Sequence, residues 1–496
     1  MISSHVGRLS DDILLMIFKL VREEDQAALD DYLEKENAII GRRWDDWGPG
    51  ELDGLDELDA LLQATRVCEH WHSLVSQTPS MWTVLEISFR EGAAALEHAR
   101  TFLQRSGSCL IQITILWDNP AWIVPVYENL VERSGGVLPP QSREEIMAGV
   151  HLGSVIQELH AHVHRWHEFT LRTTSIAHTY QALSLMSRPS VHPACGLEKL
   201  HLQFIHNSRH ATHFIGEPSL FPGSAPPIRD LLLFGITWAW PSSSMLSSNL
   251  TNLRIHYDTH MNEYNSRAGP EAEMLSQLLG ALINLRTLAL EVNLQSFDTH
   301  TIKLPRLHSL AIKSRTIDCW GTEFLHNVQM PDLRILTLCV TAEQLDDSIE
   351  YFLDELVNLT DSEDPLELDE LHLFNFAQYV DAGFLHRLYT QMSKVKTLTL
   401  GPGEDYNNLV LATALLPTSS RLQDLPLPGL QTLVVFDVPK QLIRCIVLER
   451  QSLAGPLEEL YCSYPEGNET DDWQLQVKKF YRIGHLKSTH YTDPTA

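Results

Sequence analysis

The chain has 496 residues, of which 44% are apolar and 20% charged, so it can bury a large core and wholesale disorder is not expected. Its formal net charge of −27 has no Lys- or Arg-rich block to offset it, which argues against nucleic acid or an anionic membrane as partner. The seven cysteines are scattered and never form a CxxC pair. This favours a reducing, cytoplasmic or nuclear location over a disulfide framework.

The first predicted element is an amphipathic helix that begins after Ser10. Asp11 and Asp12 follow this N-cap, where carboxylates suit the helix dipole. Apolar residues then recur on one face from Ile13 to Val21. The two aspartates argue against a signal peptide, and no window reaches 18 uninterrupted apolar residues, so no membrane span is expected.

A strongly acidic segment, residues 22–59, follows this helix. It contains fourteen Asp and Glu against four Lys and Arg. Such a segment is typical of a solvated, mobile insertion. Trp44 and Trp47 leave open the alternative that it is a binding segment.

A second amphipathic helix is predicted from Leu58 to Val75, and Pro79 ends it. Trp71 lies on its apolar face. Two short helices of this size cannot bury both apolar faces against each other alone, so they need a third element or a partner.

These residues resemble the F-box. The opening motif of the F-box, Leu-Pro-x-Glu-Ile…Ile-Phe, is similar to Leu9-Ser10-Asp11-Asp12-Ile13 with Ile17-Phe18. Its closing motif, Val-Cys-x-x-Trp…Pro-x-Leu-Trp, is similar to Val67-Cys68-Glu69-His70-Trp71 with Pro79-Ser80-Met81-Trp82. The resemblance covers residues 9–82, with Ser10 in place of the usual Pro and a much longer insert. It implies docking on the Skp adaptor of a cullin-RING ubiquitin ligase. The implied adaptor-binding residues are Leu9, Ile13, Leu14, Ile17, Phe18, Val67, Cys68, Trp71, Leu74, Pro79 and Trp82.

A short pattern with apolar residues at positions 0, 3 and 5 recurs from Leu197 onward. Its ten copies begin at Leu197, Ile228, Leu250, Leu285, Leu307, Leu333, Leu368, Val395, Leu430 and Leu457. The starts lie 22 to 35 residues apart, which is typical of leucine-rich repeats. Looser copies begin at Trp82, Leu110 and Trp166.

The predicted fold class is therefore α/β: a short all-helical F-box-like head followed by an irregular leucine-rich-repeat solenoid, a curved parallel sheet with outer helices. The usual repeat asparagine appears only at Asn293, with Asp258 a weak substitute, hence the expected irregularity. The predicted parts are a head at 1–82 with its acidic insert at about 22–59, degenerate repeats and a connecting helix at 83–196, the repeat platform at 197–465, and a C-terminal tail at 466–496.

Strand alternation places positions 2, 4 and 6 of each repeat on the concave face. Phe374, Val434, Phe436 and Tyr461 then form an aromatic and apolar patch that we predict to bind the target. A charged target would instead favour Arg254, His256 and Lys313, or the acidic helix after Glu343. The tail from Trp473 through Tyr481 is a further candidate to cover the patch.

No catalytic centre, cofactor site or metal site is predicted. The chain lacks a Gly-Lys pair and the HExxH, GxSxG and GxGxxG patterns. A helix through His160, His164 and His167 would align three imidazoles for zinc, but no carboxylate or cysteine lies at ligand spacing, and surface histidines are the favoured interpretation.

The predicted function is that of a non-catalytic substrate receptor in a Skp-cullin-F-box ubiquitin ligase. The head would bind the adaptor and the repeats would hold an unknown protein target near the conjugating enzyme. The alternative is a leucine-rich-repeat binding scaffold unrelated to ubiquitination, in which the head is only an N-terminal cap. An enzyme ranks third.

Overall fold

The computed structural model describes residues 9–39, 65–122, 142–205, 220–223, 225–236, 249–256, 272–292, 294, 296–297, 300–314, 319–340, 348–360, 366–374, 381–401, 408–418, 425–436, 438–463 and 477–482. Trp44, Trp47, Asp258, Asn293 and Trp473 lie outside these ranges. So do residues 40–64, which include the predicted start of the second helix.

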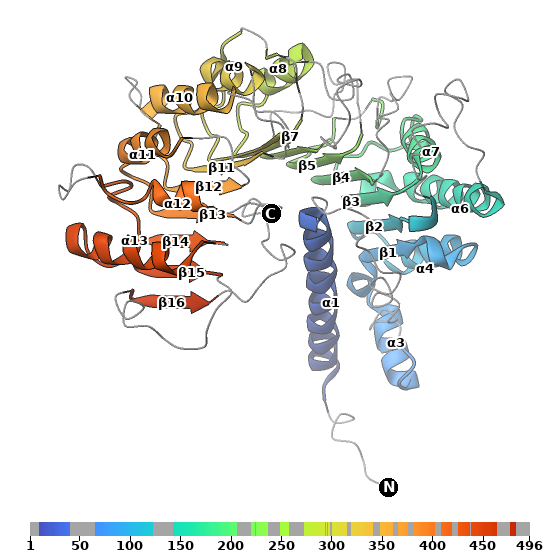
Figure 1. Cartoon of the computed structure of the whole chain (residues 1–496). Coiled ribbons are helices and arrows are strands. Elements are labelled where there is room, and N and C mark those ends of the chain that lie inside the picture. Colours follow the sequence, from blue (N-terminus) through green and yellow to red (C-terminus); the bar gives the residue numbers. More distant parts are fainter. Residues whose placement is uncertain are drawn as a thin grey trace.

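One long parallel sheet organises the chain, and it curves so that its strands line the inner side of an arc (Figure 1). Its fourteen strands follow in chain order, apart from β8 and β10, which pair in a separate small sheet. The strands of the large sheet are β1 (Val84–Ser88), β2 (Ile111–Trp117), β3 (Trp166–Thr173), β4 (Lys199–Phe204), β5 (Asp230–Phe234), β6 (Asn252–His256), β7 (Thr287–Glu291), β9 (Ser309–Ser314), β11 (Ile335–Val340), β12 (Glu370–Phe374), β13 (Thr397–Leu400), β14 (Thr432–Val435), β15 (Glu459–Cys462) and β16 (Lys479–Arg482). The small sheet consists of β8 (Ile302–Lys303) and β10 (Val328–Gln329).

The repeat pattern sets the register of this sheet. Leu336 of β11 lies opposite Leu310 of β9 and Leu371 of β12, which all hold position 3 of their repeats. These side chains are fully buried. The strands of the large sheet from β1 to β15 bury positions 3 and 5 between the sheet and the helical layer, so the predicted solenoid is confirmed.

Helices cover the outer side of the arc (Figure 1). Their apolar faces close the core against the strands. The α-helices are α1 (Asp11–Ile39), α3 (Glu69–Gln77), α4 (Ala94–Arg105), α6 (Arg143–His160), α7 (Ile176–Met186), α8 (Ala272–Ala281), α9 (Cys319–Asn327), α10 (Ser348–Thr360), α11 (Ala382–Gln391), α12 (Leu409–Thr413) and α13 (Lys440–Leu453). None of these helices combines the length and apolar character needed to cross a bilayer.

The three loose repeats of residues 82–171 are full members of the sheet, as β1, β2 and β3. Two of them carry tryptophan at position 0. The indole Nε1 of Trp82 donates to the Val75 carbonyl at 2.8 Å, and that of Trp166 to the Leu159 carbonyl at 3.1 Å. Tryptophan therefore fills the leucine position and also satisfies a carbonyl near the end of the preceding helix.

The sheet also runs further toward the C-terminus than the repeat count predicts. β16 pairs with β15 in parallel, and Val477 holds position 0 of this additional repeat, although its position 5 is Arg482. Part of the predicted tail is thus a strand.

An asparagine that the repeat rule does not find closes the turn after β13. The Asn408 side chain, 1% exposed, donates to the carbonyls of Gly401 and Phe436, both at 2.8 Å. It lies thirteen residues after the repeat start, Val395, instead of the usual eight, which explains why the spacing rule misses it.

The first helix differs most from its prediction. α1 continues to Ile39, so the first half of the acidic segment is helical and not a loop. Residues 22–39 contain neither Gly nor Pro and are rich in Glu, Ala and Leu, so helix propensity prevails over the charge. α1 runs beside α3, near the β1 end of the sheet (Figure 1).

Candidate functional site: the helical head and the concave face

One face of α1 attaches it to the rest of the chain. Leu14 and Phe18 are 2% and 6% exposed, and the Phe18 ring meets the Trp71 ring edge to face at 4.8 Å. The Asp11 carboxylate lies 3.0 Å from Nε2 of His70. Together these contacts form the seam between α1 and α3.

Arg22 joins α1 to the beginning of the sheet. Its guanidinium donates to the carbonyls of Met81 and Val84, the second at 2.6 Å. Charge-assisted bonds to backbone carbonyls stabilise more than neutral ones. Arg22 therefore fixes the direction of α1 relative to β1.

Beside this buried face, α1 carries further apolar side chains that are open to solvent. The exposed side chains recur at intervals of three and four residues: Ile13 at 45%, Met16 at 60%, Ile17 at 40%, Leu20 at 58% and Val21 at 38%. We call these five residues the outer stripe. Val67, just before α3, is 61% exposed. A row of five large apolar side chains in water is unusual for a folded monomer, so the outer stripe is a candidate interaction surface.

The structure divides the predicted adaptor-binding residues into three sets. Ile13, Ile17, Val67, Cys68 and Pro79 are exposed, while Leu9, Leu74 and Trp71 are half-buried. Leu14, Phe18 and Trp82 are buried in the chain's own core, so a direct contact of these three with a partner, as predicted, is not available.

Met16 and Leu20 were missed by the sequence analysis. The spacing offered a signal, because Met16 and Leu20 lie three residues after Ile13 and Ile17 on the same face. The predicted stripe mixed the two faces of one helix.

The predicted aromatic patch of the late repeats is only partly exposed. Val434 and Phe436 are 6% and 2% exposed, which corrects the expectation that they line an open surface. Phe374 and Tyr461 are half-buried. The Phe374 ring lies over Gly401 of the next repeat, where a Cβ would stand 1.8 Å from the ring.

Tyr481 of β16 joins Tyr461 on the concave face. The two rings stack with centroids 4.5 Å apart and planes inclined by 9°. Tyr481 keeps 42% of its surface exposed. Strand β16 of the predicted tail thus extends the aromatic row instead of only covering it.

The middle strands carry charges across the concave face that pair with one another. Nε2 of His201 and Nη2 of Arg254 lie 3.3 and 3.5 Å from Oδ1 of Asp230. Burial opposes ionisation of Asp230, yet the contacts of its carboxyl with His201 and Arg254 lower its pKa to about 2. Burial lowers the pKa of His201 to about 4, so its imidazole is neutral at pH 7.

A second group lies on β6, β7 and β9. Glu291, 5% exposed, is 2.9 Å from Nζ of Lys313 and 3.2 Å from Nδ1 of His256. Burial again opposes ionisation, but Lys313 and His256 lower the pKa of Glu291 to about 2. The alternative basic strip of Arg254, His256 and Lys313 is therefore matched by carboxylates already in place.

The three histidines of the zinc alternative do not share one helix. α6 ends at His160, His164 lies in a 3-10 helix at Val163–Arg165, and His167 belongs to β3. The helical alignment on which that alternative depends is wrong. Across the part of the chain that the structure describes, no group of three or more His, Cys, Asp or Glu side chains is placed to hold a metal ion.

Comparison with known proteins identifies no family for this chain. No family model and no curated protein sequence matches the chain, so the F-box resemblance stands on its own residues. Among solved structures the chain is similar to the leucine-rich repeat-containing protein LegL7 from Legionella pneumophila, at 11% identity and a TM-score of 0.33, over 64% of this chain and 91% of that one. The repeat assignment rests on the strand register described above.

Proposed function

We propose that this chain is a non-catalytic protein receptor, in which the head docks on the Skp adaptor of a cullin-RING ubiquitin ligase and the repeat platform holds a target protein. The observation that carries the proposal is the outer stripe of α1. A helix that served only to cap the first strand would turn its apolar residues inward, as Leu14 and Phe18 do. The outer stripe has no such role among the residues that the structure describes.

The chemistry of the stripe fits an apolar groove on a helical partner. Its residues recur at i, i+3, i+4, i+7 and i+8, the spacing by which an amphipathic helix lies in a groove. Val67 and Cys68 extend the surface from the beginning of α3. The F-box resemblance names the Skp adaptor as the partner, because the exposed Ile13, Ile17, Val67 and Pro79 all belong to the matching residues.

On the platform, we propose that Phe374 and Tyr461, joined by Tyr481, supply apolar contacts to the target. Val434 and Phe436 take part only as support beneath this surface, since both are buried. Aromatic side chains with partial exposure are typical anchors of protein interfaces.

The adaptor is tested by co-elution. The purified full chain is mixed with the Skp adaptor and run on a sizing column, with Met16→Asp/Leu20→Asp as the test variant. Met147→Asp/Val150→Asp is the matched control, because these α6 residues are 46% and 52% exposed and lie outside the head. We expect the wild type and the control to co-elute and the test variant to separate.

The rival function is a repeat scaffold unrelated to ubiquitination, with the head as a cap, and the Arg22 bonds to Met81 and Val84 are compatible with it. Failure of the wild type to co-elute with the adaptor, together with capture of other proteins that the stripe variant loses, would favour this rival.

A further inference from the structure

The residues just before each strand form a hydrogen-bonded ladder along the edge at which the strands begin. We call this the amino edge. In the middle of the sheet, the amide of His308 donates to the carbonyl of Arg286 at 2.8 Å, and the amide of Arg334 to that of His308 at 2.9 Å. Asp369 and then Lys396 continue the ladder at 2.8 and 2.7 Å. These residues are therefore direct neighbours on successive strands.

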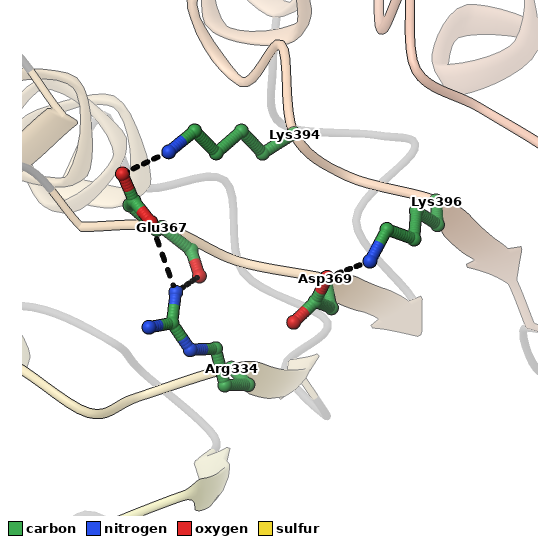
Figure 2. Close-up of polar contacts among 5 residues, drawn as sticks. All are labelled: Arg334, Glu367, Asp369, Lys394 and Lys396. Carbon is green, nitrogen blue, oxygen red and sulfur yellow. Dashed lines mark hydrogen bonds and ion pairs between the residues drawn. The ribbon is translucent and has the colours of Figure 1, made fainter.

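Over much of the amino edge, cations face carboxylates. Arg229 lies 3.6 Å from Glu198, and Lys478 lies 2.9 Å from Glu458. Figure 2 shows the same alternation before β12 and β13: Lys396 reaches Asp369 at 2.6 Å, and Lys394 reaches Glu367.

The alternation stops before β7 and β9. Arg286 and His308 are adjacent and exposed, and Arg306, two residues before His308, is exposed as well. None of the three makes an ion pair with any residue in the described ranges. Arg334 on the next strand is shared with Glu367 (Figure 2), at 3.3 Å. In a chain with a net charge of −27, Arg286 and Arg306 are two neighbouring positive charges without an ion pair in the described residues.

Like charges on neighbouring strands repel, so this arrangement costs folding free energy that an opposite charge would recover. Asp332 lies before β11 but forms no ion pair within the described part of the chain. Within the described residues, no carboxylate is therefore paired with Arg286 or Arg306.

We propose that Arg286, Arg306 and His308 bind an acidic segment of a protein partner along the amino edge. This deepens the proposed function, since it assigns a second contact surface for the target. Arg334, which Glu367 shares, lies one strand beyond these residues and forms the far end of the binding surface. Strands lie about 4.8 Å apart, so Arg286 and Arg334 are separated by about 10 Å, which three residues of extended peptide span. Two carboxylates at that spacing would meet both ends of the patch. A nucleic acid, with its denser charge, is disfavoured by the net charge of the chain.

The test is fluorescence anisotropy with the full chain, without the adaptor, so that the result does not depend on adaptor docking. The probe is a labelled peptide of about nine residues with glutamate at every third position. We expect Arg286→Glu/Arg306→Glu to weaken binding at least about tenfold. The matched control Arg229→Glu/Lys478→Glu changes the net charge equally on paired cations of the same edge, and it should stay within about twofold.

The variant Asp332→Asn should change the peptide affinity in the opposite direction, because removal of a nearby carboxylate should tighten peptide binding. A purely structural role of these residues would not produce tighter binding. A phosphoserine version of the peptide distinguishes the source of the anion: tighter binding assigns it to a phosphorylated segment, equal binding to acidic residues.

The proposal is overturned if the glutamate peptide binds no better than its glutamine counterpart, if both charge-reversed variants lose binding equally, or if a single-stranded oligonucleotide binds more tightly than the peptide. If the adaptor does not co-elute with the same preparation, that result contradicts only the proposed docking of the head on the adaptor.

Discussion

The repeat body and the helical head differ in how completely they bury their apolar side chains. In the body, the apolar residues at positions 3 and 5 are buried, and the charges of the concave face described above are paired. In the head, α1 buries Leu14 and Phe18 but leaves five apolar residues in water. The body thus buries its repeat positions, while α1 keeps apolar residues exposed that pack against no described part of the core.

Large-to-small changes should separate the two regions most strongly. Leu336 is fully buried, so Leu336→Ala is expected to destabilise the body by about 2–5 kcal/mol through lost contacts and a cavity. Ile17→Ala should change the free energy of unfolding by less than about 0.5 kcal/mol, because Ile17 is 40% exposed. Urea denaturation followed by circular dichroism measures both. Equal losses would mean that the outer stripe is packed in solution.

The charge pairs of the concave face provide the next test. Lys313→Met leaves the buried Glu291 carboxylate with His256 alone, which we expect to cost up to about 3 kcal/mol. The loss should shrink in the double variant Lys313→Met/Glu291→Gln, since no buried charge then remains unpaired. A double variant as unstable as the single one would show that packing, and not charge pairing, stabilises this part of the body.

The buried imidazole of His201 predicts a pH dependence. Its pKa is about 4 in the folded chain, against 6.5 as its ordinary value, so the unfolded chain binds the proton first as the pH falls. Stability from this group is present above pH 6.5 and is lost toward pH 4, by about 2 kcal/mol at pH 5.

His201→Gln should remove that part of the pH dependence, seen as a smaller difference in urea midpoint between pH 7 and pH 5. Asp230 and Glu291, whose pKa values are about 2, contribute only at lower pH, as the pH falls from their ordinary range toward 2. An unchanged slope between pH 7 and pH 5 would contradict the role of His201.

A smaller loss, confined to one helix, is expected at the attachment of the head. Arg22→Met removes two side-chain bonds to the Met81 and Val84 carbonyls. We expect a loss of about 1–2 kcal/mol that is confined to α1. Faster amide hydrogen exchange in α1, with unchanged exchange in β11 and β12, would check it. Faster exchange throughout the sheet would show that head and body unfold together.

The sequence was most informative where one physical rule governs many residues. The alternation of a half-buried strand places positions 3 and 5 inward, so the register of Leu310, Leu336 and Leu371 followed directly. The additional strand at β16 escaped because Arg482 stands at its position 5.

The site was less predictable, because exposure depends on contacts between distant segments. The two faces of α1 differ only in what packs against them, and Trp71 is more than fifty residues from Phe18. The space for the Phe374 ring depends on the absent side chain of Gly401 in the next repeat. The helix beyond Arg22 was missed because charge was given more weight than helix propensity.

The central claim, that the outer stripe of α1 docks on the Skp adaptor, is tested most directly by calorimetric titration of the adaptor into the full chain. The account predicts binding by the wild type and by Met147→Asp/Val150→Asp with equal affinity, and a loss of at least about 100-fold for Ile17→Asp/Leu20→Asp, since two charges would enter an apolar interface. All three proteins should unfold at the same urea concentration. Equal affinity of the stripe variant and the wild type, or no binding by a folded wild type, would contradict the claim.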